Sequence, residues 1–222
     1  MSEERYGEFV LVRRHGHVAE LVLDRPKAMN AVSMAMARSV IAACAALGAD
    51  RDARVVVVTS SHERAFCVGA DLKERNGMTD AELLRSRPLS RGTYTGVLEL
   101  PMPTIAAVHG YALGGGFELA LSCDVIVADD TAVVGLPEVS VGVIPGGGGT
   151  QLLPRRVGAA RAAELIFSAR RVEAAEAHEL GLVDQLVEAG RDVAVAPPPW
   201  ATCHSMTCRG GAGAAMCAPR CT

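Results

Sequence analysis

The chain has 222 residues, 50% of them hydrophobic, and a formal net charge of −3. This length suits one domain, or one domain with an appendage. No apolar run approaches the roughly 20 residues of a membrane span, and no basic block is present to bind nucleic acid. The charged residues 1–5 are not followed by the apolar segment of a secretory signal, so we expect a cytoplasmic protein.

The first half of the chain carries the signals of an α/β fold. Residues 9–12 and 18–23 are β-rich runs separated by a polar turn, which predicts a hairpin. Ser33 is a suitable N-cap for an alanine-rich helix that runs to about residue 47. The continuous β-branched run at 55–59 is typical of a strand buried on both faces. Strand, helix and strand in this order predict a largely parallel sheet covered by helices.

The remaining helices and strands are predicted from weaker sequence patterns. Small residues at 65–71 predict a turn that leads into a helical polar segment, and residues 75–98 predict a surface helix with loops. Strands are expected at 104–108 and 125–128, and helices at 151–157, 158–169 and 172–180.

The stretch from Val108 to Ala120 holds the strongest local indication of a site. A buried strand breaks on Gly114, Gly115 and Gly116 and resumes with helical spacing, which places free backbone N–H groups at a helix N-terminus. Glu118 puts a carboxylate in the first helical turn. Such an arrangement can stabilise an oxyanion while a proton moves. The alternative is an ordinary strand-to-helix turn with a dipole-compensating glutamate.

A second carboxylate and a third glycine loop follow. Glu138 comes directly after Pro137, and residues 144–150 are glycine-rich. No Lys-Ser/Thr pair follows this loop, and no dinucleotide-binding fingerprint is present, so neither a phosphate loop nor a dinucleotide site is predicted. Glu138 could also be a plain turn carboxylate.

Five motifs in order give the chain a resemblance to the enoyl-CoA hydratase (crotonase) family over about residues 5–190. They are residues 25–31 (RPKAMNA), 65–71 (AFCVGAD), 114–118 (GGGFE), 135–138 (GLPE) and 144–151 (IPGGGGTQ). The resemblance implies a spiral of repeated β-β-α units, assembled as a homotrimer or a dimer of trimers. It also implies an acyl-CoA thioester as substrate, with coenzyme A part of the substrate and no separate cofactor.

By this resemblance, the backbone N–H groups of Ala70 and Gly115 hold the oxyanion of the thioester. Glu118 would activate water for attack on Cβ, and Glu138 would supply the proton at Cα. Contacts with the coenzyme A thioester are expected from Lys27, Ala28, Ala70, Asp71, Leu72, Lys73, Gly114 and Gly115. The alternative for the two lysines is that they are only solvated.

The chain is especially similar to methylglutaconyl-CoA hydratases that also bind AU-rich RNA through a lysine-rich helix. The matching segment here, residues 33–47, has a single basic residue, Arg38. RNA binding is therefore not expected.

Residues 191–222 depart from the family, so we divide the chain into a core at 1–190 and a tail at 191–222. The tail is rich in Pro, Cys and Gly and has no periodicity, which predicts disorder. Its abrupt composition suggests an out-of-frame or aberrant end that replaces the family's C-terminal helices. Its cysteine spacings match no paired zinc ligands, and we predict no metal site. Cys44, Cys67 and Cys123, in apolar contexts, are expected to be buried and reduced.

The leading functional prediction is hydration of a 2-enoyl-CoA to a 3-hydroxyacyl-CoA. One alternative is an enoyl-CoA isomerase that uses one glutamate. Another is a catalytically impaired remnant that binds coenzyme A. Acyl-chain specificity stays open, because the pocket walls are expected partly from residues 75–98.

Overall fold

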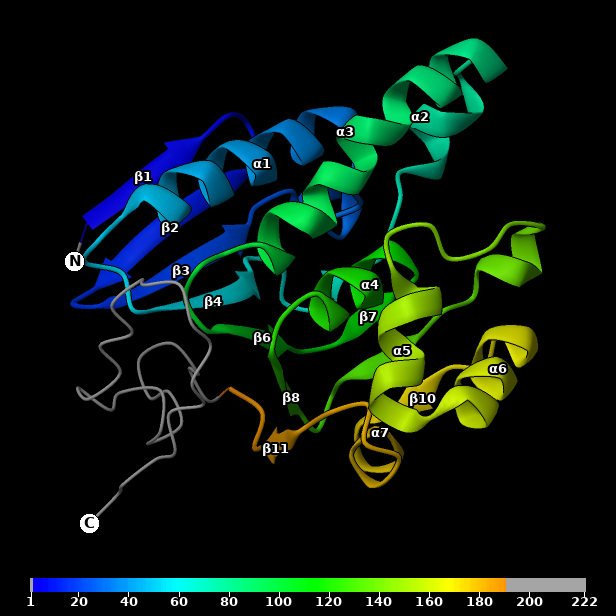
Figure 1. The fold of residues 1–222 in the computed structure, drawn as a ribbon. Helices are drawn as coiled ribbons and strands as arrows, with labels where there is room; N and C mark the ends of the chain where they lie inside the picture. The colour runs from blue at the N-terminus through cyan, green and yellow to red at the C-terminus, as the bar shows by residue number, and fades with distance from the viewer. Residues whose placement is uncertain (1, 191–222) are drawn as a thin grey trace, which may run out of the picture.

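The computed structural model describes residues 2–190, which form two β-sheets with helices packed around them (Figure 1). The predicted tail lies outside the described residues. The larger sheet has the strand order β1-β2-β3-β4-β6-β8-β11. Its strands are β1 (Ser2–Tyr6), β2 (Val10–His15), β3 (Val18–Leu23), β4 (Val55–Ser60), β6 (Thr104–Val108), β8 (Val125–Asp129) and β11 (Gln185–Val187). The first three strands pair antiparallel and all later neighbours pair parallel, which confirms the predicted sheet.

The smaller sheet has the order β10-β9-β7-β5 and uses strands of two or three residues. They are β5 (Ala65–Cys67), β7 (Tyr111–Leu113), β9 (Val133–Gly135) and β10 (Val172–Glu173). The helix predicted over 172–180 is wrong for its first two residues. Val172 is fully buried and pairs with Val134 of β9, so the helix starts only at Ala174.

The helical segments surround these sheets. They are η1 (Pro26–Ala28), α1 (Met34–Ala49), α2 (Leu72–Asn76), α3 (Asp80–Leu98), α4 (Gly115–Leu121), η2 (Glu138–Val141), α5 (Gly149–Val157), α6 (Ala159–Ser168) and α7 (Ala174–Glu179). The predicted cap of α1 is confirmed, since Ser33 Oγ accepts a hydrogen bond from Met36 N at 3.1 Å. Thr79 and Glu82 form a capping box that starts α3. Within residues 2–190, no helix combines the length and apolar character needed to cross a bilayer.

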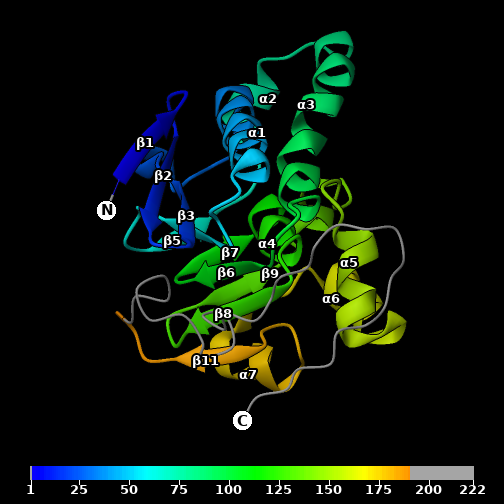
Figure 2. The same ribbon diagram turned by 60° about the vertical axis from the view of Figure 1, so that its left-hand side comes forward.

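Helices α1 and α3 lie side by side, and the N-terminal end of α3 extends beyond the sheets (Figures 1 and 2). The core lies between the larger sheet, α1, α4 and the smaller sheet, with Phe66 and Phe117 fully buried. Burial of a side chain of this size contributes about 1.5–3 kcal/mol. Cys44, Cys67 and Cys123 are buried free thiols, as predicted.

Candidate active site

The predicted glycine turn joins β7 to α4. Gly114 has φ 54° and ψ −127°, a conformation that glycine adopts without a steric penalty. Its N–H donates to Gly135 O at 2.8 Å, which fixes the turn against β9. All seven residues of α4 are buried, so the N–H groups of its first turn start inside the molecule.

A second turn brings the Ala70 amide next to this helix start. Gly69 has φ 89°, and a Cβ atom added to it would lie 2.8 Å from Leu113 O and 2.9 Å from Gly115 N. A Cβ atom added to Gly115 would in turn lie 3.6 Å from Ala70 N. Among the hydrogen bonds within residues 2–190, neither Ala70 N–H nor Gly115 N–H is a donor. Two free amides therefore adjoin, which is the arrangement that can hold one oxyanion.

Glu118 is the charged exception in an otherwise apolar and buried helix, with only 2% of its surface exposed. Its Oε1 accepts hydrogen bonds from Gly147 N at 2.7 Å and from Gly149 N at 2.8 Å. Burial raises the pKa of Glu118, and the hydrogen bonds from the glycine loop oppose that shift. The carboxylate is thus held in place and is more basic than an exposed glutamate.

Glu138 begins η2 and lies close to the glycine turn, because a Cβ atom added to Gly114 would be 3.1 Å from Glu138 Oε1. Its Oε2 is buried and has no hydrogen-bond partner in the described part of the chain. Burial raises the pKa of Glu138 to about 7, and the negative charge of Glu118 adds to the shift. Near neutral pH this carboxyl can hold a proton and give it up.

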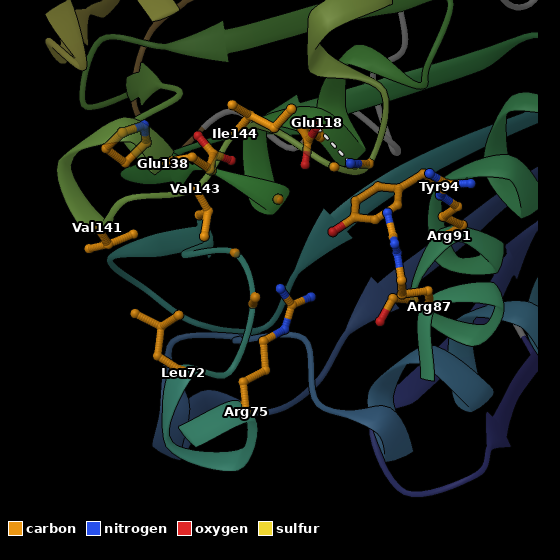
Figure 3. A pocket seen from close by; sticks show the side chains of 18 of the residues that line it. Leu72, Arg75, Arg87, Arg91, Tyr94, Glu118, Glu138, Val141, Val143 and Ile144 are labelled. Carbon is orange, nitrogen blue, oxygen red and sulfur yellow. Dashed lines mark hydrogen bonds between the residues drawn. The ribbon is translucent and has the colours of Figure 1, made fainter. Parts of the chain in front are cut away.

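These groups line one cavity of about 420 Å³ (Figure 3). Of the residues predicted to form the site, the cavity is lined by Ala70, Leu72, Gly114, Gly115, Glu118 and Glu138. Lys27, Ala28, Asp71 and Lys73 are not among its lining residues. The Asp71 carboxylate instead pairs with Arg25 Nη1 at 2.7 Å and caps α2.

The loop at residues 25–33 supports the turn that carries Ala70. Val32 N donates to Gly69 O at 2.7 Å, and Asp71 N donates to Val32 O at 3.0 Å. Asn30 is completely buried in a left-handed conformation, and its Nδ2 donates to Ser60 Oγ at 2.7 Å and to Phe66 O at 3.1 Å. Asn30 therefore links the loop to the strand that ends just before the turn.

The Asn30→Ala variant is expected to unfold with a free energy lower by about 2–4 kcal/mol, because buried partners of the amide lose their hydrogen bonds. Urea denaturation measures this loss. The chain's other asparagine, Asn76, is exposed, so Asn76→Ala is the matched control and should change the free energy by less than about 0.5 kcal/mol. Equal stabilities of the two variants would contradict a structural role for the Asn30 side chain.

Residues 75–98 were expected to supply part of the pocket wall, and both α2 and α3 line the cavity. Which side chains they contribute, among them Arg75, Arg87, Arg91 and Tyr94, was not predicted. The missed signal is the spacing of Ser86, Arg87, Ser90, Arg91 and Tyr94 along one helix face.

Comparison with known proteins identifies the family. A family model described as Enoyl-CoA hydratase/isomerase matches residues 13–195. The chain belongs to this family. The crotonase-like α/β fold predicted from the sequence is thereby confirmed, as is the resemblance on which it was based.

Solved members of the enoyl-CoA hydratase/isomerase family share the architecture. The crystal structure of an enoyl-CoA hydratase from Bacillus anthracis is 42% identical with a TM-score of 0.79, covering 82% of this chain and 70% of that one. An enoyl-CoA hydratase/carnithine racemase from Magnetospirillum magneticum is 29% identical with a TM-score of 0.80, covering 87% and 72%. Members described by different activities thus share this fold.

Curated relatives extend over a longer chain. The mitochondrial enoyl-CoA hydratase domain-containing protein 2 of Bos taurus is 48% identical over 170 residues, which are 77% of this chain and 57% of the relative. A Bacillus subtilis relative is 45% identical over 173 residues, which are 66% of its length.

Proposed function

We propose that the chain hydrates a 2-enoyl-CoA thioester to a 3-hydroxyacyl-CoA. The observation that carries the proposal is that Glu118 and Glu138 line the same cavity as the free amides of Ala70 and Gly115. Hydrogen bonds from both amides to the thioester oxygen make Cβ electrophilic and stabilise the enolate that forms. Water addition then requires one base and one acid, which the two carboxyl groups supply.

The environments of the two glutamates support different roles. Glu118 accepts two backbone hydrogen bonds, which favour its charged form, so it takes the proton of the attacking water. Glu138 has its pKa raised to about 7 by burial and delivers a proton to Cα. Environments that separate two carboxyl groups in this way are typical of acid–base pairs.

The coenzyme A portion is proposed to lie near Lys27, Ala28, Asp71 and Lys73, beyond the cavity lining. Lys27 and Lys73 are exposed and can meet phosphate groups without being buried. A homotrimer or a dimer of trimers is proposed from the resemblance alone.

One observation favours the remnant alternative, a chain that binds coenzyme A thioesters with little turnover. The cavity rim exposes the apolar side chains of Leu72, Val141, Val143 and Ile144, with exposed fractions of 53%, 59%, 54% and 71%. An apolar wall that is exposed to this extent shields the reacting groups from solvent poorly.

Hydration of crotonyl-CoA by the complete chain, measured as the loss of the absorbance of the conjugated thioester, separates the two functions. Binding without hydration would reject the hydratase.

The pH dependence of this reaction tests the pair. Hydration needs one proton on the two carboxyl groups, and that proton dissociates as the pH rises through the pKa of Glu138, about 7. We therefore expect kcat/KM to fall about tenfold for each pH unit well above that pKa. Circular dichroism at each pH is the control for folding. A kcat/KM that stays flat from about pH 6 to about pH 9 would contradict the assigned acid.

A further inference from the structure

The side chain of Tyr94, on α3, packs against both glycine segments that build the site. A Cβ atom added to Gly115 would lie 2.5 Å from the Tyr94 hydroxyl, and one added to Gly147 would lie 2.6 Å from the ring atoms Cε2 and Cζ. Contacts this short leave no room for a side chain at either glycine unless the ring moves. Tyr94 is only 6% exposed, so its ring is held between the start of α4 and the loop before α5.

The hydroxyl of Tyr94 is a donor that the described residues leave free. The Tyr6 hydroxyl donates to Glu4 Oε2 at 2.8 Å, whereas the Tyr94 hydroxyl has no hydrogen bond within residues 2–190. Figure 3 shows the ring extending from its helix, with the hydroxyl end pointing into the cavity that Tyr94 lines. A buried phenol usually has a hydrogen-bond partner. Here the cavity is the place from which a ligand can supply one.

The electrostatic surroundings keep this phenol protonated. Burial raises the pKa of Tyr94, the negative charge of Glu118 adds to the shift, and the positive charge of Arg75 opposes it. The hydroxyl therefore keeps its proton at the pH values near 7 at which Glu138 gains or loses one. Tyr94 is suited to donating a hydrogen bond and not to acting as a base.

This free donor lies beside the two free amides. The Cβ position of Gly115, 2.5 Å from the Tyr94 hydroxyl, is 3.6 Å from Ala70 N, and covalent geometry places it about 2.5 Å from Gly115 N. Three donors without partners in residues 2–190 thus surround one small volume. Hydrogen bonds span about 2.7–3.2 Å between donor and acceptor, so a single oxygen atom held there can accept from all three.

We propose that the Tyr94 hydroxyl is a third hydrogen-bond donor to the thioester oxygen, next to the amides of Ala70 and Gly115. This proposal rests on the function proposed above and adds a catalytic residue to the same site. Negative charge grows on the thioester oxygen as the enolate forms, so the hydrogen bond is stronger in the transition state than in the bound substrate. Its loss should therefore lower kcat and leave KM nearly unchanged.

The Tyr94→Phe variant keeps the ring between the two glycines and removes only the hydroxyl. With crotonyl-CoA, its kcat is expected to fall about 10- to 100-fold while KM stays within about twofold. Tyr111→Phe is the matched control, because Tyr111 lies on β7 outside the cavity lining and its ring faces Arg171. It should change kcat by less than about twofold, and thermal unfolding midpoints show whether both variants are folded.

Binding of acetoacetyl-CoA to the complete chain measures the same hydrogen bond without turnover. This ligand loses a proton between its two carbonyl groups, and the resulting enolate is followed by its near-ultraviolet absorbance. A donor that favours the enolate lowers the pKa of the bound ligand. Tyr94→Phe is expected to raise that pKa by about 1–2 pH units, which corresponds to the 10- to 100-fold loss in kcat, and Tyr111→Phe should not change it.

Equal enolate pKa values in Tyr94→Phe and the unchanged chain would overturn the proposal. A loss of acetoacetyl-CoA affinity that is the same at every pH would also overturn it, because the hydroxyl would then support packing alone.

The two measurements keep this proposal apart from the hydratase proposal. A Tyr94-dependent enolate pKa without hydration of crotonyl-CoA would reject the hydratase and keep the third donor. Hydration at the same kcat in Tyr94→Phe and the unchanged chain would reject the third donor alone.

Discussion

Hydration of crotonyl-CoA by the Glu118→Gln variant is expected to have a kcat about 10²- to 10⁴-fold below that of the unchanged chain. The glutamine oxygen can still accept the hydrogen bonds that Gly147 N and Gly149 N donate, so the site should keep its shape. What is lost is the ability to take a proton from water. Glu138→Gln should cause a loss of similar size, because its amide cannot give a proton to Cα. Steady-state kinetics with crotonyl-CoA measures both.

Glu179→Gln, on an exposed position of α7, is the matched control and should leave kcat unchanged within about twofold. Isomerisation of a 3-enoyl-CoA measured on the same variants separates the isomerase alternative. If one of the two glutamine variants isomerises as fast as the unchanged chain and no chain hydrates, the reaction uses a single glutamate and the paired mechanism is wrong.

A methyl group added at Gly69 is expected to push apart the backbone amides of Ala70 and Gly115. The added Cβ would lie 2.8 Å from Leu113 O and 2.9 Å from Gly115 N, which are backbone atoms that cannot rotate away. Gly69→Ala should therefore separate the Ala70 and Gly115 amides and lower kcat about 10²- to 10³-fold, the effect of losing one oxyanion donor. Kinetics together with the thermal unfolding midpoint measures the change.

The left-handed backbone itself makes alanine unfavourable by about 1–2 kcal/mol, so a control must carry the same cost. Gly181 has φ 78° and no atom within 4 Å of an added Cβ. Gly181→Ala should lower stability by this amount and leave kcat unaffected. If Gly69→Ala and Gly181→Ala had the same kcat, close approach at Gly69 would have no part in the oxyanion site.

Strong local signals explain which parts of the fold could be predicted. The β-branched run at residues 55–59 and the cap at Ser33 depend on neighbouring residues alone, and both were located correctly. Strand β1 was missed because its sequence, SEERY, is polar and lies at a sheet edge. The two-residue strand β10 has no periodicity, and only its pairing with β9 defines it.

The candidate site divides in the same way. Glycine runs and a glutamate inside an apolar helix marked the turn around Gly115 and Glu118. Glycine in a helix or strand and a buried charge both lower stability, so their presence indicates a functional requirement. A contribution of residues 75–98 to the pocket wall was expected, but the sequence does not show which of their side chains face the cavity. That depends on how α2 and α3 pack, so the positions of Arg75, Arg87 and Arg91 in the lining could not be derived.

The hydrogen bonds from Gly147 N and Gly149 N to Glu118 couple the protonation of this carboxylate to the conformation of the glycine loop. Any proton that Glu118 takes up weakens its oxygen as an acceptor, and with it the hold on the loop before α5. Protonation of Glu118 and loosening of this cavity wall are therefore linked, and each favours the other by the same free energy. In the proposed reaction, the glycine loop would therefore be coupled to the protonation of Glu118 through a single oxygen atom.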